Sequence, residues 1–211
     1  NSNQQLQNRK FYVSGPMTQD IHGGLWMTAL ITGGQDQTGK SMAEEIARYK
    51  QRRAIKQELT YPISKDELWE LISRPGNLNE CHPLCRTNEA LEWQDDNHSD
   101  RLVYLNGRTY VRQFINWNIG EGYDLIIGEV DGPQSYVVWE ITELGENTSS
   151  LSITVYPYLL DKLNPIVSYL PFVLYIKPKL STYLKSVVKG FAYYAEHNQA
   201  VPRNHWGRHS W

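Results

Sequence analysis

The chain is 211 residues long, enough for one domain or for one domain with a sizeable extension. Hydrophobic residues make up 40% of it and charged residues 21%, which excludes a wholly disordered chain. The 21 Lys and Arg against 23 Asp and Glu give a net charge of −2, so no overall field favours nucleic acid or an anionic membrane.

Aromatic residues are unevenly distributed among their three types, with 14 Tyr and 7 Trp against only 4 Phe. Most of the aromatic surface therefore carries a hydroxyl or an indole N–H, and these groups need hydrogen-bond partners when they are buried. The composition indicates a partly polar interior or a binding surface.

Residues 1–53 are predicted to be an N-terminal extension. The polar, Gln/Asn-rich residues 1–24 predict an arm, 25–32 a possible strand, and 41–53 a helix with an apolar stripe.

Residues 34–41 (GQDQTGKS) fit the P-loop pattern, in which backbone N–H groups and a lysine bind nucleotide phosphates. The surrounding segment also resembles the start of short-chain dehydrogenases, although Gln37 stands where their central glycine should be. Both folds require several strand–helix units, and the sequence that follows predicts hairpins. We therefore expect an accidental match, so that ATP–Mg would not raise the melting temperature.

From residue 54 onwards the pattern of elements becomes sharper. Alternating apolar and polar residues over 54–61 predict a strand. Ser64 and Glu67 match a capping box that opens a helix through Ser73, and a short second helix or turn is expected up to about Cys81.

Six further strands are expected, separated by turn signals. Asn106–Gly107 is a strong signal for a two-residue hairpin. Since no helix lies between the strands, they predict an antiparallel meander and exclude a doubly wound parallel sheet. The expected strands span 86–93, 101–105, 109–118, 123–130, 136–144 and 151–158.

The last element is a helix over about 179–197, whose apolar stripe is long enough to cover most of one sheet face. Between the last strand and this helix lie the mainly apolar residues 159–178, which we call the insert. It is predicted to be a lid over a cavity, an extra helix that completes the core, or a surface that touches a membrane or a partner.

This order of elements resembles the helix-grip fold of the START-like (SRPBCC) superfamily, which includes polyketide cyclases and pollen-allergen proteins. The resemblance is carried by 59–69 (LTYPISKDELW), 79–84 (NECHPL) and 183–191 (YLKSVVKGF). It implies an α+β fold, with a curved antiparallel sheet wrapped around a long C-terminal helix and two short helices after the first strand.

The resemblance covers about residues 54–198, which are the expected helix-grip domain, and it leaves 199–211 as a tail. Residues 1–53 and the insert both depart from the family pattern.

A curved sheet that grips one helix leaves a space between the two layers. Several residues are candidates to point into this space. Each of them would either contact a ligand there or be an ordinary core residue. They are Tyr104, Tyr110, Arg112, Trp117, Tyr123, Trp139 and Tyr156, with Tyr158 beside them, from the strands, and Tyr183, Val187 and Phe191 from the helix.

Arg112 shares strand parity with Tyr110 and Phe114, so it could face the cavity and hold a carboxylate or phenolate bidentately. Two alternatives are a solvent-facing charge on the convex side and a cross-sheet pair with Glu140.

His82 could bind a ligand or act as an acid/base, or it could simply end a helix.

Cys81, His82 and Cys85 offer only three donors where structural zinc takes four, so we expect no metal, and no other cofactor is expected. No signal-peptide pattern is visible, and the uncharged run 163–176 is too short to span a bilayer. A soluble, cytoplasmic protein is expected.

The main functional hypothesis is the binding of a small hydrophobic molecule, such as a lipid, a fatty acid or a polycyclic aromatic, with no nucleic acid partner. The second is an enzyme of the polyketide cyclase or aromatase type, with His82 and Arg112 as candidate catalytic residues. The third is an interaction subunit that acts through residues 1–53 and the insert.

Overall fold

The computed structural model describes residues 41–94, 97–160 and 163–208. The expected arm and first strand, and all of the P-loop-like segment except Ser41, lie outside the described residues. The chain divides into two compact units, residues 1–45 and 46–211, and the architecture below is that of the second.

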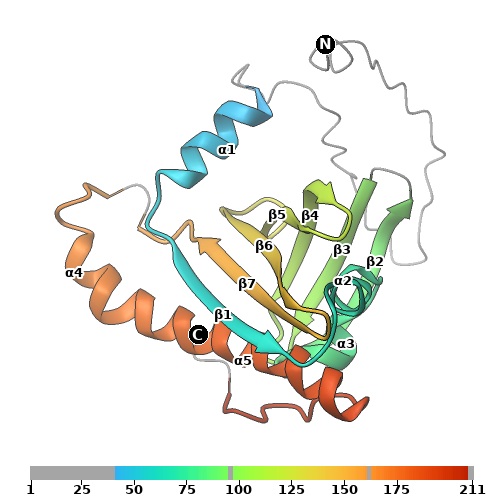
Figure 1. Cartoon of the computed structure of the whole chain (residues 1–211). Helices are drawn as coiled ribbons and strands as arrows, with labels where there is room; N and C mark the ends of the chain where they lie inside the picture. Colours follow the sequence, from blue (N-terminus) through green and yellow to red (C-terminus); the bar gives the residue numbers. More distant parts are fainter. Residues whose placement is uncertain (1–40, 95–96, 161–162, 209–211) are drawn as a thin grey trace, which may run out of the picture. The chain divides into compact units, whose positions relative to one another are not determined.

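The described residues form one antiparallel sheet of seven strands, in the order β1-β7-β6-β5-β4-β3-β2 (Figure 1). The first strand pairs with the last, and the other strands follow in chain order, so the predicted meander is confirmed. The strands are β1 (Ile55–Tyr61), β2 (Cys85–Gln94), β3 (Asn97–Tyr104), β4 (Thr109–Asn118), β5 (Gly122–Gly128), β6 (Gln134–Gly145) and β7 (Thr148–Tyr156).

Two short helices, α2 (Lys65–Ser73) and α3 (Leu78–Cys81), follow β1. The capping box is formed as predicted: the Ser64 N–H donates to Glu67 Oε2 at 2.8 Å, and the Glu67 N–H donates to Ser64 Oγ at 3.2 Å. Ser41 forms a similar pair with Glu44 before α1 (Met42–Lys50), so this last residue of the P-loop-like segment acts as a helix cap.

The closing helix α5 (Lys177–His197) lies along the sheet (Figure 1), and its apolar stripe is buried in the main core. Tyr61 on β1 donates its hydroxyl proton to the Val188 carbonyl oxygen at 2.7 Å. A Cβ atom at Gly190 would lie 2.0 Å from the Cys81 carbonyl oxygen, so only glycine lets α5 pass this close to α3.

The opposite face of the sheet carries a second, smaller cluster of Tyr49, Ile126 and Tyr136. Tyr49, on the last turn of α1, stacks on Tyr136 with ring centroids 5.8 Å apart. Residues 46–53 therefore belong to the second compact unit, although the sequence predicts them to be part of the extension.

The sequence predicts a polar loop over 94–100, between the expected strands 86–93 and 101–105, and this prediction is wrong in part because β3 already begins at Asn97. Trp93 pairs with His98 across the two strands and packs edge-on against its ring at 5.2 Å. The sequence of this segment is polar and does not indicate a strand, because the side chains that partner His98 and Asp100 come from neighbouring strands.

The insert is helical from Tyr169 onwards. Helix α4 (Tyr169–Pro171) and the π-helical turn η1 (Phe172–Ile176) run directly into α5. Pro178 lies at the start of α5 and has no N–H to donate to the preceding turn, where the helix changes from π-helical to α-helical geometry. No helix of the described residues is both long and apolar enough to cross a membrane.

Candidate functional site

A cavity of about 320 Å³, partly open to solvent, lies between the sheet and α5. Its size is at the lower end of the range of about 300–1,000 Å³ that is usual for ligand pockets. The wall is mainly aliphatic. The strands contribute Leu102, Leu125, Ile127, Val137, Ile153 and Val155, and α5 contributes Leu180, Leu184 and Val187.

Six of the ten predicted ligand-binding residues line this cavity, and so does Tyr158. Their contact with a ligand stays a prediction. The six are Tyr104, Tyr110, Arg112, Trp139, Tyr183 and Val187.

Tyr156 and Phe191 lie outside the cavity wall. Ile153 and Val155 face the cavity, so the alternation along β7 turns Tyr156 to the other face, where its ring lies 5.8 Å from that of Tyr136. Phe191 is fully buried and packs edge-on against Trp139, with ring centroids 5.3 Å apart.

Trp117 and Tyr123 also lie outside the wall, in an aromatic cluster. A bulge in β4 between Phe114 and Asn116 inverts the alternation, so that Trp117 stacks on Tyr123 at 5.3 Å and on His98 at 4.0 Å. The members of the cluster are Trp69, Trp93, His98, Phe114, Trp117 and Tyr123.

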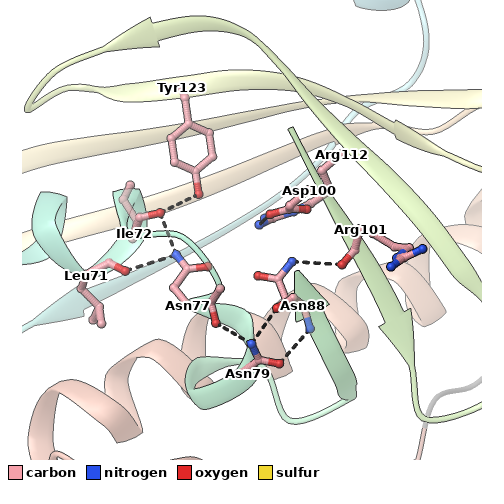
Figure 2. A network of polar contacts seen from close by, with 10 residues as sticks. Leu71, Ile72, Asn77, Asn79, Asn88, Asp100, Arg101, Arg112 and Tyr123 are labelled. Atoms are coloured by element: carbon pink, nitrogen blue, oxygen red, sulfur yellow. Dashed lines mark hydrogen bonds and ion pairs between the residues drawn. The ribbon is translucent and has the colours of Figure 1, made fainter. Parts of the chain in front are cut away.

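Arg112 is buried in the cavity wall and paired with Asp100 on β3. Its Nε donates to Asp100 Oδ1 at 2.8 Å and its Nη2 donates to Oδ2, so the two side chains form a two-point ion pair (both are labelled in Figure 2). Both alternatives from the sequence are wrong. Arg112 does not face solvent, and Glu140 is exposed and accepts from Ser152 Oγ at 3.4 Å.

Burial by itself would lower the pKa of Arg112, but the charge and hydrogen bonds of Asp100 outweigh it and raise that pKa. The guanidinium therefore keeps its proton, and its charge is neutralised inside the protein. A ligand carboxylate would have to compete with Asp100 for it.

His82 ends α3 and also takes part in a chain of polar groups along the cavity wall. Its Nδ1 accepts from the Leu84 N–H at 3.1 Å, which assigns the ring proton to Nε2. Nε2 lies 3.0 Å from the Tyr183 hydroxyl, and that hydroxyl lies 2.8 Å from the hydroxyl of Tyr104.

Burial raises the pKa of Tyr183 to about 12 and also raises that of Tyr104. Both hydroxyls are therefore neutral at physiological pH. Together with His82 they can orient one oxygen atom of a ligand without placing a charge in the cavity.

The more accessible wall residues mark the mouth of the cavity: Arg108, Tyr110, Tyr158 and Tyr175. Burial, and then the charge and hydrogen bond of Tyr110, raise the pKa of Tyr158. Tyr175 and the buried Ile176 belong to the insert, so the insert forms part of the wall.

Three asparagines that the sequence did not single out, the buried Asn77 and Asn88 and the half-buried Asn79, connect the elements around the site (Figure 2). Asn77 Nδ2 donates to the Leu71 and Ile72 carbonyls at 3.2 and 2.7 Å and so ties the end of α2 to α3. Asn79 and Asn88 exchange two hydrogen bonds of 2.7 Å that fix α3 to β2. The run of asparagines after the end of a helix was the sequence signal from which these residues could have been identified.

Cys81 and Cys85 are buried and free. Burial raises the pKa of their thiols to about 12 and about 11, so both are neutral packing groups at physiological pH. Within the part of the chain that the structure describes, no group of three or more His, Cys, Asp or Glu side chains could hold a metal ion.

Comparison by sequence finds no family model and no curated protein that matches this chain. Solved structures do match. The Zhui aromatase/cyclase from Streptomyces sp. R1128 has a TM-score of 0.53 at 15% identity, over 69% of this chain and 94% of that one.

A START superfamily protein from Mycobacterium smegmatis has a TM-score of 0.51 at 14% identity, over 69% of this chain and 99% of that one. DynU16, from the dynemicin biosynthetic locus, has a TM-score of 0.53 at 15% identity over 70% of this chain, which spans only 48% of that protein. The observed topology and these likenesses agree with the resemblance in the sequence: the chain has the START-like (SRPBCC) helix-grip fold.

Proposed function

We propose that this protein binds a small hydrophobic molecule in the cavity between the sheet and α5. The observation that carries the proposal is an aliphatic wall with one neutral polar corner, made by Tyr104, Tyr183 and His82. Burying about 200 Å² of ligand apolar surface there would contribute roughly 5 kcal/mol before the entropy cost of binding. The polar corner would orient one oxygen of the ligand.

Two neighbouring residues of β6 allow a matched test. Val137 lines the cavity, and Val138 points to the outer face. Val137→Phe should fill the cavity and weaken binding of a fluorescent apolar probe at least tenfold, while Val138→Phe should leave it unchanged. Native mass spectrometry of the purified protein should find a co-purified lipid-like mass that Val137→Phe removes. Unchanged binding in a folded Val137→Phe variant would exclude the cavity as the site.

A second candidate function, cyclisation of a polyketide-like chain, is supported by the same polar corner. Hydroxyls fixed by His82 could polarise a carbonyl of a chain that the cavity holds in a folded conformation. Tyr183→Phe separates the two functions. If the protein is a carrier, the variant should still bind its ligand, and neither it nor the wild type should show turnover. If the protein is a cyclase, the variant should bind substrate but lose the turnover of the wild type.

Contact of the insert with a membrane is a further proposal, supported by an exposed apolar crest of Ile166, Val167, Leu170 and Leu174. We propose an anionic bilayer as the partner, because Lys177 and Lys179 follow the crest directly and would meet anionic headgroups. An interaction role for residues 1–53 and a cytoplasmic location stay predictions.

A further inference from the structure

Beyond α5 the chain turns back and packs beside α3. Asn198 ends α5 in the left-handed conformation, with φ of 50°, and its N–H donates to the Tyr194 carbonyl oxygen at 2.8 Å. We call the following residues 199–207 the strap. The side chain of Val201 is buried, so the strap is packed against the domain, in a region that the sequence leaves as a tail.

The strap supplies hydrogen-bond donors to the end of α3. This helix has only four residues, so a following turn that would donate to the Glu80 carbonyl is missing. The Val201 N–H donates to the Glu80 carbonyl oxygen at 2.8 Å, and the Asn204 N–H donates to the Pro83 carbonyl oxygen at 2.9 Å. The strap therefore satisfies one carbonyl group on each side of His82.

The bond from Val201 is linked to the partner of Leu84. In a continuous α-helix the Leu84 N–H would donate to the Glu80 carbonyl, four residues earlier. Here the Val201 N–H occupies this acceptor, and the Leu84 N–H donates to His82 Nδ1 at 3.1 Å. Because Nδ1 accepts, the ring proton lies on Nε2, which is 3.0 Å from the Tyr183 hydroxyl.

Side chains of the strap make two further contacts. Arg203 Nη1 donates to the carbonyl oxygen of His82 at 3.3 Å. The Trp206 ring centre lies 5.7 Å from Lys189 Nζ, so a cation–π contact joins the strap to α5. The strap is thus held both beside α3 and against α5, and it contacts the backbone of His82 directly.

We propose that the strap is a positioning element of the polar corner, with Val201 as its main positioning residue. It holds His82 in the tautomer and orientation with which the corner recognises a neutral oxygen atom of the ligand. The inference rests on the proposed binding function. No residue of the strap is among the described residues that line the cavity, so the strap acts on the ligand through His82 and leaves apolar contact with the wall unchanged.

The test compares 2-naphthol with naphthalene, two probes that differ by one hydroxyl group. Wild-type protein at pH 7 should bind 2-naphthol about fivefold more tightly, because the polar corner adds one hydrogen bond. Val201→Pro removes the donor to Glu80, and it should abolish this preference without changing the affinity for naphthalene. Val201→Ala is the matched control. It keeps the N–H and loses only apolar bulk, so it should lower the urea midpoint and retain the preference.

NMR of protein labelled with ¹⁵N-histidine gives a second readout, with the His82 signals assigned by their absence in His82→Gln. Wild type should show the ring proton on Nε2, and Val201→Pro should move it partly to Nδ1. A change in stability alone would not produce this shift.

The outcomes distinguish the strap from the binding function. A ring proton on Nδ1 in wild type overturns the inference without any variant, and so does a folded Val201→Pro that keeps both the tautomer and the preference. Equal binding of the two probes by wild type also overturns it, while the proposed binding function stands. If neither probe binds, the proposed function fails, and the His82 tautomer in wild type and Val201→Pro still tests the strap.

Discussion

The hydroxyl oxygens of Tyr183 on α5 and Tyr104 on β3 lie 2.8 Å apart, so a hydrogen bond joins the closing helix to the sheet at the cavity wall. His82 reaches the same Tyr183 hydroxyl from the end of α3. Three elements that are far apart in the sequence thus meet at one oxygen atom.

Removing that oxygen should weaken the whole polar corner. We expect Tyr183→Phe to lower the free energy of unfolding by about 1–3 kcal/mol, because Tyr104 and His82 both lose a buried hydrogen-bond partner. Urea denaturation measures the change. Tyr193→Phe, the same change on a half-buried face of α5, is the control and should stay within about 0.5 kcal/mol. A loss no larger than that of the control would mean that the corner contributes nothing to stability.

Because Asp100 and Arg112 form a buried ion pair, the effects of substituting them on the free energy of unfolding should not be additive. Asp100→Asn should cost about 3–5 kcal/mol, because it leaves the Arg112 guanidinium charged and buried without its counter-ion. Asp100→Leu/Arg112→Met removes both charges and should be more stable than Asp100→Asn. A double-mutant cycle by urea denaturation measures the coupling between the two residues. A double variant that is no more stable than Asp100→Asn would argue against this coupling.

The close passage of α5 over α3 predicts a steric effect at Gly190. Alanine is normally about 1 kcal/mol better than glycine within a helix. We nevertheless expect Gly190→Ala to destabilise the protein by about 1–3 kcal/mol, because its Cβ would lie 2.0 Å from the Cys81 carbonyl oxygen.

The control for this steric effect is Gly145→Ala, whose Cβ would meet its nearest neighbour, Thr148 Cβ, at 4.0 Å. That variant should be close to neutral in thermal unfolding. A Gly190→Ala protein as stable as wild type would show that the helix can shift aside.

The buried thiols predict a loss of stability in alkaline solution. Burial raises the pKa of Cys85 from 9.0 to about 11 and that of Cys81 to about 12, so the folded protein holds these protons more tightly than the unfolded chain does. Their contribution is complete below pH 9 and is lost as the pH rises from 9 through these values.

Urea midpoints should therefore fall between pH 8 and pH 10.5, and less so in Cys81→Ala/Cys85→Ala. In native protein at pH 8 both thiols should react slowly with a disulfide reagent, and unfolding should release them. Rapid reaction of the native protein would contradict the burial.

Substitutions on the buried side and on the exposed side of the insert should differ in their effects on stability. Phe172 is buried, so Phe172→Ala should cost about 3–5 kcal/mol. Leu170 and Leu174 are exposed, so Leu170→Ser/Leu174→Ser should leave stability nearly unchanged. The double variant should also lower the fraction of protein that floats with phosphatidylserine vesicles, and flotation equal to wild type would exclude the crest as a membrane contact.

The elements and their order could be predicted from the sequence, because they depend on local signals. The alternation over 54–61, the Ser64–Glu67 capping box and the helical stripe that begins at Leu180 each lie within a few turns or one strand, and each appears in the structure. The helix-grip topology followed from them, since consecutive hairpins can only form an antiparallel sheet.

The sequence could not show which side chains meet in the cavity, because the face on which a strand residue lies depends on a register of single residues. Asn106–Gly107 predicts a two-residue hairpin, yet Tyr104 pairs with Arg108 across a three-residue loop in which Gly107 has φ of 90°. That one extra residue places Asp100 opposite Arg112 and neutralises it. A bulge in β4 likewise turns Trp117 to the same face as Phe114, where it packs on Tyr123 beyond the cavity wall. One residue more in a loop or strand turns every later side chain to the other face, and the energy that selects it comes from packing between distant segments.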